Sequence, residues 1–157
     1  MEFIVCSDNH GSSKTLDALR KNYPEVTLKI HCGDSEMPPE ALDSFLSVNG
    51  NCDYMNFFPN DRIIEFEGIR IYVTHGHLLQ RSDPLYDLAI RAQAYGCEMA
   101  CTGHTHRFID EVIEGVRILN PGSLAYNRDG SKQSYALCSI DENKDIHITR
   151  CAIEDIL

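Results

Sequence analysis

Five short apolar runs along the chain are each followed, within three residues, by a side chain that can bind a metal. The runs span residues 3–6, 26–32, 45–48, 69–73 and 99–101. The side chains that follow them are Asp8, His10, Asp34, Asn51, His75, His104 and His106. Because the carboxyl ends of strands in an open α/β sheet share one edge, and ligands bind beyond that edge, we expect these side chains to converge. The pattern therefore predicts a metalloenzyme.

The length and composition predict a single globular domain over residues 1–157. A chain of 157 residues can bury a substantial core, and 43% apolar with 24% charged residues is typical of globular proteins. The formal charge of −10 repels nucleic-acid backbones, so strong nucleic-acid binding is not expected. No apolar run approaches the length of a membrane span, so no membrane partner is expected. The pattern specifies no oligomeric state.

The seven cysteines indicate a reducing compartment rather than a disulfide framework. The number is odd, and the first twenty residues lack the apolar stretch of a signal peptide, so we expect a cytoplasmic protein. Four of the cysteines lie in strand-like runs and are expected to act as small buried hydrophobes: Cys6, Cys32, Cys101 and Cys138. The Cys97 and Cys101 pair has no second pair to complete a zinc ribbon, and a thiol-redox function lacks a Cys-x-x-Cys motif.

The order of elements predicts parallel strands first and hairpins later. A strand at 2–6, a helix between Ser12 or Ser13 and Pro24, and a strand at 26–32 form a right-handed crossover. The remaining elements are a short helical or irregular piece from Pro38-Pro39, a third strand at 45–48, a helix from Asp83-Pro84 to Gly96, and hairpins at 62–74, 108–119 and 134–151. We therefore predict an α/β fold, a single-domain four-layer αββα sandwich of two mixed β-sheets flanked by helices.

The types of side chain at the strand ends define the metals that they suit. Carboxylate, imidazole and amide groups together favour manganese, iron, nickel or zinc, with no thiolate required. Two imidazoles one residue apart, as at His104 and His106, can address two adjacent ions, and Asp34 is the natural bridge between them. The two histidines that fall inside strands, His31 and His147, are expected to be packed or surface residues instead.

Taken in order, these motifs resemble the signature blocks of the calcineurin-like metallophosphoesterase superfamily. The resemblance spans residues 3 to about 123, and it is strongest to the small stand-alone phosphodiesterases of bacteria and archaea, which share their fold with a eukaryotic retromer subunit. The blocks that carry it are Asp8-x-His10, Gly33-Asp34, Gly50-Asn51-Cys52-Asp53, His75-Gly76-His77, Gly103-His104-Thr105-His106 and the turn Asn120-Pro121-Gly122-Ser123.

The resemblance implies a centre of two divalent ions, most naturally manganese, with nickel, iron or zinc as alternatives. One ion would be held by Asp8, His10 and His106, the other by Asn51, His75 and His104, and Asp34 would bridge them. A hydroxide shared by the two metals would attack phosphorus in line and hydrolyse a small phosphate ester. A phosphodiester is the favoured substrate, while phosphomonoesters and pyrophosphates remain open.

The chain departs from many superfamily members at Cys52, where they carry a histidine credited with assisting the leaving group. A thiol is a poorer acid catalyst than imidazolium at neutral pH, so we expect easier turnover of substrates with good leaving groups. His77 is the next candidate for contacting the leaving oxygen, with a supporting or exposed histidine as the alternative. Arg128 could clamp a substrate phosphate or lie solvated in its loop, and Asp53 could orient a neighbouring ligand.

The main alternative is a non-catalytic protein-binding scaffold of the retromer-subunit type with a vestigial metal site. Scaffold versions tend to lose metal ligands, whereas all seven positions match here. The sequence therefore favours the enzyme.

Overall fold

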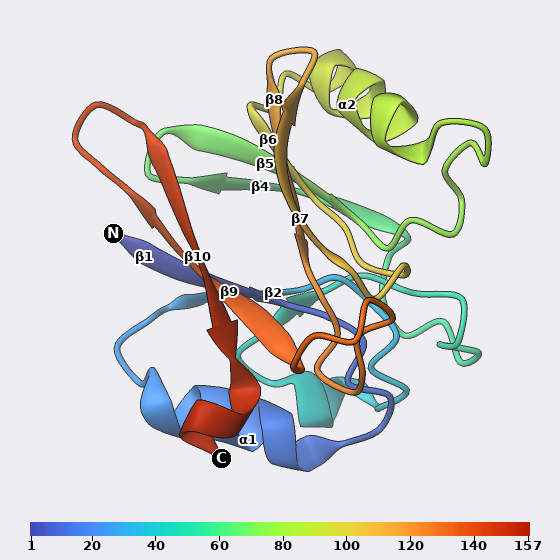
Figure 1. Cartoon of the computed structure of the whole chain (residues 1–157), viewed down its shortest axis with the longest axis vertical. Helices are drawn as coiled ribbons and strands as arrows, with labels where there is room; N and C mark the ends of the chain where they lie inside the picture. The colour runs from blue at the N-terminus through green and yellow to red at the C-terminus, as the bar shows by residue number, and fades with distance from the viewer.

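The computed structural model describes residues 1–157 as two five-stranded sheets packed face to face, with helices on the outer faces (Figure 1). The first sheet has the order β10-β9-β1-β2-β3, and the second has the order β4-β5-β6-β8-β7. The strands of the first sheet are β1 (Glu2–Cys6), β2 (Leu28–His31), β3 (Leu46–Ser47), β9 (Ser134–Ile140) and β10 (Ile146–Ala152). Those of the second are β4 (Asp61–Phe66), β5 (Ile69–Thr74), β6 (Met99–Cys101), β7 (Phe108–Ile113) and β8 (Val116–Pro121).

Both sheets are mixed, and each contains a parallel set. Strands β1, β2 and β3 run parallel, and β9 pairs antiparallel with β1. Strands β5, β6 and β8 also run parallel, with β4 and β7 antiparallel at the edges. The loops that follow β1, β2, β3, β5 and β6 all lie toward the right of the molecule in Figure 1. The two parallel sets therefore deliver their loops to one side.

The alternation of side chains along the strands divides the core into layers. In β1, Phe3 and Val5 point into the core between the sheets, whereas Ile4 and Cys6 point outward under α1 (Ser13–Asn22). Leu16 and Leu19 of α1 cover that outer face together with the 3-10 helix η2 (Ile153–Ile156). The layer arrangement confirms the predicted αββα sandwich.

The opposite outer face is covered by α2 (Pro84–Ala94). Leu88, Ala89 and Ala92 of this helix are buried against β6 and β8. Asp83 caps its first turn by accepting a hydrogen bond from the backbone N–H of Tyr86 (3.3 Å). The helix therefore begins at the Asp83-Pro84 signal in the sequence.

Two predicted strands are shorter than expected. The run 26–32 forms a strand only over Leu28–His31, because the Val26 N–H bonds back to the Tyr23 carbonyl in a turn. The run 45–48 contributes only Leu46–Ser47, because the Phe45 N–H closes a turn with Leu42, the last residue of the 3-10 helix η1 (Pro39–Leu42).

The other expectations about local structure hold with small changes. The hairpin turn at Glu67-Gly68 is confirmed, with both residues at positive φ. Ser12 occupies the N-cap position of α1 but makes no side-chain capping bond. No helix has the length and apolarity that crossing a membrane requires. The four cysteines in strand-like runs are all buried and unpaired: Cys6, Cys32, Cys101 and Cys138.

Candidate metal centre

The seven side chains singled out in the sequence lie together where the loops of the two sheets meet. Asp8 and His10 follow β1, Asp34 follows β2, and Asn51 follows β3. His75 follows β5 in the other sheet, and the turn after β6 carries His104 and His106. The seven side chains therefore converge as predicted, and they come from loops of both sheets.

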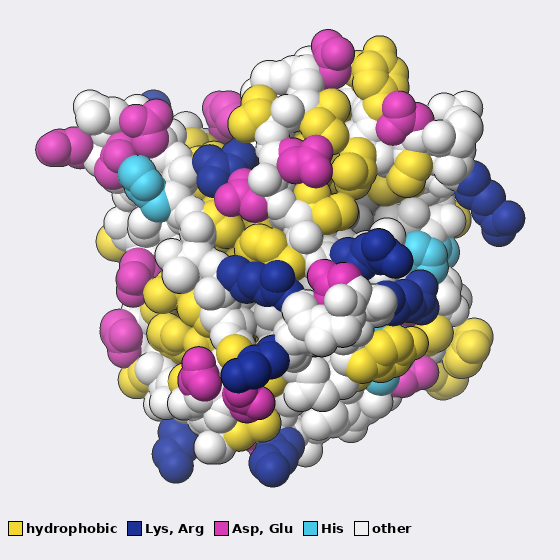
Figure 2. All heavy atoms as spheres, in the orientation of Figure 1, with side chains coloured by type: hydrophobic (Ala, Val, Ile, Leu, Met, Phe, Trp, Pro, Cys, Tyr) yellow, Lys and Arg dark blue, Asp and Glu magenta, His cyan; other side chains and the backbone are white.

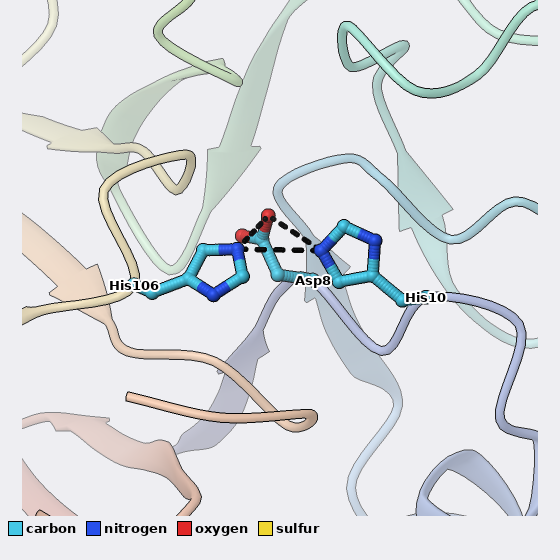
Figure 3. A group of neighbouring side chains, drawn as sticks. All are labelled: Asp8, His10 and His106. Atoms are coloured by element: carbon cyan, nitrogen blue, oxygen red, sulfur yellow. Dashed lines mark hydrogen bonds and ion pairs between the residues drawn. The ribbon is translucent and has the colours of Figure 1, made fainter. Parts of the chain in front are cut away.

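One group of donors is formed by Asp8, His10 and His106 (Figure 3). The His106 Nε2 lies 3.1 Å from Asp8 Oδ1, and the His10 Nε2 lies 3.7 Å from the same oxygen. The two Nε2 atoms are 3.3 Å apart. Asp8 and His106 are buried, while His10 is partly exposed.

The second group surrounds Asn51 and His75. The Asn51 Oδ1 lies 3.0 Å from His75 Nε2 and 3.0 Å from His104 Nδ1. The Asp34 Oδ2 lies 3.2 Å from His75 Nε2, and Asp8 Oδ1 lies 4.0 Å from that nitrogen. Asp34 and Asp8 thus stand between the two groups of nitrogen donors.

In His10, His75 and His106 the Nε2 atom faces the candidate centre, and the Nδ1 atom contacts an oxygen atom on the other side of the ring. The His75 Nδ1 lies 2.7 Å from the Cys32 carbonyl, and the His106 Nδ1 lies 2.9 Å from the Tyr126 carbonyl. The His10 Nδ1 lies 3.3 Å from Glu36 Oε2. Since carbonyl and carboxylate oxygens only accept, these contacts put the ring proton on Nδ1 and leave the Nε2 lone pair facing the centre.

This arrangement fits divalent ions. With Nδ1 protonated in both rings, the lone pairs of His10 and His106 face each other at 3.3 Å, an arrangement that needs a proton or a cation between them. Carboxylate, imidazole and amide donors without thiolate suit ions such as manganese, iron, nickel or zinc. The donor set therefore fits divalent metal ions.

The pKa shifts of Asp8 and His75 also favour positive charge at the centre. Burial opposes ionisation of Asp8, but in the metal-free protein a proton held between the His10 and His106 Nε2 atoms can be donated to its carboxylate, and such hydrogen bonds outweigh burial and lower the Asp8 pKa. Burial also opposes protonation of His75, but the Asp34 and Asp8 carboxylates raise the His75 pKa. The buried centre thus carries negative charge and attracts positive charge, supplied by protons or by metal.

The backbone at the centre adopts conformations that are uncommon for these residue types. Five of the seven residues have positive φ, between 46° and 70°: Asp8, His10, Asp34, His104 and His106. Backbone hydrogen bonds hold these loops to one another, from Asp8 N–H to the Gly33 carbonyl (3.0 Å) and from His10 N–H to the Asp34 carbonyl (3.1 Å). Such strain is typical of functional sites.

Glycines allow the loops to pack closely around the two carboxylates. A Cβ on Gly103 would lie 2.7 Å from Asp8 Oδ2, and a Cβ on Gly50 would overlap the Asp34 carboxylate. Neither glycine has positive φ. The absence of a side chain, and not backbone freedom, is what these positions require.

Asp53 supports the centre from outside, as the sequence suggested. Its Oδ2 accepts hydrogen bonds from the backbone N–H groups of Asp34 and Gly50, both at 2.8 Å. Its Oδ1 accepts from the Glu36 N–H, also at 2.8 Å. The carboxylate therefore fixes the loop that carries Asp34.

The two catalytic candidates, Cys52 and His77, lie at the edge of the centre, whereas the side chain of the substrate-binding candidate, Arg128, does not contact it. The Cys52 N–H donates to Asp34 Oδ1 (2.8 Å), and burial together with the Asp34 charge raises the pKa of the Cys52 thiol to about 11. The His77 ring lies 5.5 Å from the His75 ring, and burial and His75 lower the His77 pKa. Arg128 is exposed, and only its backbone N–H contacts the centre, through the His106 carbonyl (3.0 Å).

Two hollows flank the centre. One, of about 290 Å³, is mostly apolar, and its lining includes Cys52, Glu36 and the exposed side chains of Tyr54 and Phe57. The other, of about 630 Å³, is bordered by Asn51 and is more polar. Neither hollow could be predicted from the sequence, because each is lined by segments from separate parts of the chain.

Sequence reasoning missed several residues that hold the ligand loops together. His31 was expected to be a packed or surface histidine within a strand, and it is buried. It also connects two loops: its Nε2 lies 2.8 Å from Asn9 Oδ1, and its Nδ1 accepts a hydrogen bond from the Gly33 N–H at 3.0 Å. The Ser123 Oγ donates to the Asp8 carbonyl (2.9 Å), and the Asn120 Nδ2 donates to the Gly103 carbonyl (2.9 Å). The turn 120–123 was recognised as a motif, and that was the signal available for these two residues.

A family model described as the calcineurin-like phosphoesterase superfamily domain matches residues 1–143. The chain belongs to this superfamily. A relative from Bacillus subtilis, the probable metallophosphoesterase YsnB, is 35% identical over 146 residues, covering 91% of this chain and 86% of the relative. The resemblance of the motifs is thus confirmed, and the protein is a member of the metallophosphoesterase family.

Solved structures agree with this calcineurin-like fold. A predicted phosphoesterase from Streptococcus pneumoniae TIGR4 superposes with a TM-score of 0.90 at 28% identity, covering 98% of this chain and 90% of that one. Wild-type Vps29 from Entamoeba histolytica, in complex with Zn²⁺, superposes with a TM-score of 0.71 at 22% identity, covering 98% and 99%. The similarity to Vps29 concerns the fold alone.

Proposed function

We propose that this calcineurin-like protein is a binuclear metal-dependent phosphodiesterase acting on a small phosphate ester. The observation that carries the proposal is the convergence of seven metal-capable side chains from both sheets, with the inward nitrogens of His10 and His106 only 3.3 Å apart. Superfamily membership supports hydrolysis of a phosphate ester as the reaction class.

The residues divide into two sets of ligands. Asp8, His10 and His106 would hold one ion, and Asn51, His75 and His104 the other, with Asp34 between them. Manganese is the expected metal, with nickel, iron or zinc as alternatives. Such ions, when bound, would supply an acidified water as the nucleophile for in-line attack on phosphorus and would offset negative charge on the phosphoryl oxygens.

The chain itself offers little acid catalysis to the leaving group. Cys52 is a poor proton donor with or without metal: in the metal-free protein its thiol pKa is raised to about 11, and nearby cations would favour the thiolate, which has no proton to give. Burial and His75 lower the pKa of His77, which favours its neutral ring. We therefore expect fast hydrolysis only where the leaving alcohol is itself acidic, such as p-nitrophenol.

A diester is favoured over a monoester by the space around the centre. A phosphodiester carries two substituents, and the two hollows beside the centre, of about 290 and 630 Å³, offer room for one substituent each. Cys52 borders the first hollow and Asn51 the second. A monoester would leave one of them without an occupant.

The test is the variant Asp34→Asn, assayed with bis(p-nitrophenyl) phosphate and manganese. Asparagine preserves the shape and can still accept from the Cys52 N–H, but it removes the bridging charge. We expect a loss of activity of about 100-fold or more and a lower manganese content, since even supporting residues of metal sites change affinity 10–100-fold. Asp145→Asn, at an exposed turn between β9 and β10, is the matched control. An unchanged rate in Asp34→Asn would refute the bridging role.

The scaffold alternative rests on the fold that the chain shares with Vps29. It predicts no hydrolysis of any phosphate ester even when metal is bound, since the Vps29 structure is itself a complex with Zn²⁺. Elemental analysis of the full chain, together with the same diester assay, separates the two functions.

A further inference from the structure

The larger hollow lies directly beside the candidate metal centre. Two of the proposed ligands of one ion, Asn51 and His104, border it, and its lining also includes His77, Arg81 and Arg107. One substrate molecule could therefore place a phosphate at the centre and a second group in this hollow, with only a short linker between them.

The two arginines of this hollow are free to bind an anion. Six of the nine arginines donate side-chain hydrogen bonds within the chain. Arg81, Arg107 and Arg128 make none, although the chain contains 24 acidic residues. Arg81 follows β5 and Arg107 follows His106, so both unpaired guanidinium groups belong to ligand-bearing loops. Guanidinium groups bind phosphate strongly, and often through two parallel hydrogen bonds.

His77 offers a third donor. Its Nδ1 is buried with no hydrogen-bond partner. A buried N–H without an acceptor is unfavourable, so the proton of the neutral ring is favoured on Nε2. The ring can then donate from Nε2 to a group in the hollow that it lines.

The charges distinguish the two hollows. No Asp or Glu lines the larger one, whereas Glu36 and Asp53 line the smaller one. In Figure 2, Lys and Arg side chains gather beside histidine at the right of the molecule, on the side where Figure 1 shows the loops after the parallel strands. An anionic group would therefore be accepted in the larger hollow and repelled from the smaller one.

We propose that the hollow lined by Arg81 and Arg107 binds a second phosphate on the substrate, so that the preferred substrate is a phosphodiester with one phosphorylated arm. This inference rests on the proposed phosphodiesterase function and specifies its substrate class. The phosphate at the metal centre is cleaved, and the phosphate in the hollow serves only for binding.

The test compares two substrates that differ by one group. Both are p-nitrophenyl diesters of thymidine 5′-phosphate, one with and one without a 3′-phosphate, and both release p-nitrophenol from the full-length, manganese-loaded protein. We expect kcat/KM to be about tenfold higher or more for the compound with the 3′-phosphate, mainly through KM, as for one charge-assisted hydrogen bond. In Arg81→Gln and Arg107→Gln, that ratio should fall toward one.

Lys21→Gln is the matched control, because it removes the same charge from the exposed end of α1 and should keep the wild-type ratio. Equal kcat/KM for the two thymidine compounds in the wild type, or an unchanged ratio in the Arg81→Gln/Arg107→Gln double variant, would overturn the inference. If bis(p-nitrophenyl) phosphate is cleaved in that case, the proposed function still stands. If no diester is cleaved, the proposed function fails as well.

Discussion

Acidification below about pH 6.5 should destabilise this protein through His31, the last residue of β2. The ring is fully buried, and both of its nitrogens have partners. Its Nε2 lies 2.8 Å from Asn9 Oδ1, and its Nδ1 accepts the Gly33 N–H at 3.0 Å. A proton added to Nδ1 would face that N–H donor, so the buried ring is built to stay neutral.

The size of the effect follows from the His31 pKa. Burial lowers it to about 4, from 6.5 for an exposed histidine. Between these values the unfolded chain binds the proton and the folded chain does not, so the free energy of unfolding falls as the pH falls. At 1.36 kcal/mol per pKa unit, the loss between pH 7 and pH 4.5 is about 2.5 kcal/mol, a large part of the 5–15 kcal/mol typical of a domain.

Two histidines of the candidate centre, His10 and His75, act in the opposite direction and must be separated from His31, whereas burial lowers the pKa of His104, which acts in the same direction as His31. A hydrogen bond to Asp8 raises the His10 pKa, and carboxylates raise that of His75 despite its burial. In the metal-free protein, these two rings contribute stability that is present below pH 6.5 and lost as the pH rises through their folded pKa values. The total pH dependence of the wild type is therefore a sum of opposing contributions.

Comparison with His31→Gln isolates the contribution of His31, because glutamine does not titrate and can still donate to Asn9. The assay is urea unfolding of both metal-free chains at pH 7 and pH 4.5. We expect the wild type to lose about 2.5 kcal/mol more than the variant between the two pH values, whatever their absolute stabilities. The same pH dependence in both chains would show that His31 is not kept neutral by its surroundings.

Three further predictions concern the loops and thiols. Gly103→Ala should weaken manganese binding about 10–100-fold, as measured by titration calorimetry, because its Cβ crowds Asp8. The control is Gly115→Ala, whose Cβ meets no neighbour but whose φ is +76°. It should cost about 1–2 kcal/mol of stability in urea unfolding and leave the manganese affinity unchanged. Cys52→His should speed hydrolysis of diesters with poor leaving groups if protonation is limiting, and no change would point to His77 or bulk water as the proton donor. In the folded, metal-free protein, an aromatic disulfide reagent should reach only Cys52 and Cys151, with Cys52 slow at pH 7, and the other cysteines should react only after unfolding.

The elements that the sequence predicted well are those with local signals. The alternation of residues around Glu67-Gly68 and the Asp83-Pro84 start of α2 both correspond to elements of the structure. The parallel arrangement of β1 and β2 followed from a strand, helix and strand in close succession. The short strand Leu46–Ser47 was overestimated, because a turn at Phe45 carries no strong signal of its own.

The parts of the centre that escaped prediction depend on contacts between distant segments. The carbonyls of Cys32 and Tyr126 orient His75 and His106, yet any residue at those two positions would offer a carbonyl. The same limit applies to the arginines. Arg128 was singled out because it follows a recognised turn, whereas the lining of the hollow by Arg81 and Arg107 depends on the path of long loops.

The division of the donors between the two sheets explains why packing, rather than any single loop, defines the centre. The loops of the first sheet supply Asp8, His10, Asp34 and Asn51, and the loops of the second supply all the remaining histidines. Neither sheet alone holds a complete set for either proposed ion, because each set takes donors from both. The apolar core between the sheets therefore fixes the separation of the ligands, and a substitution there would alter the metal centre without touching it.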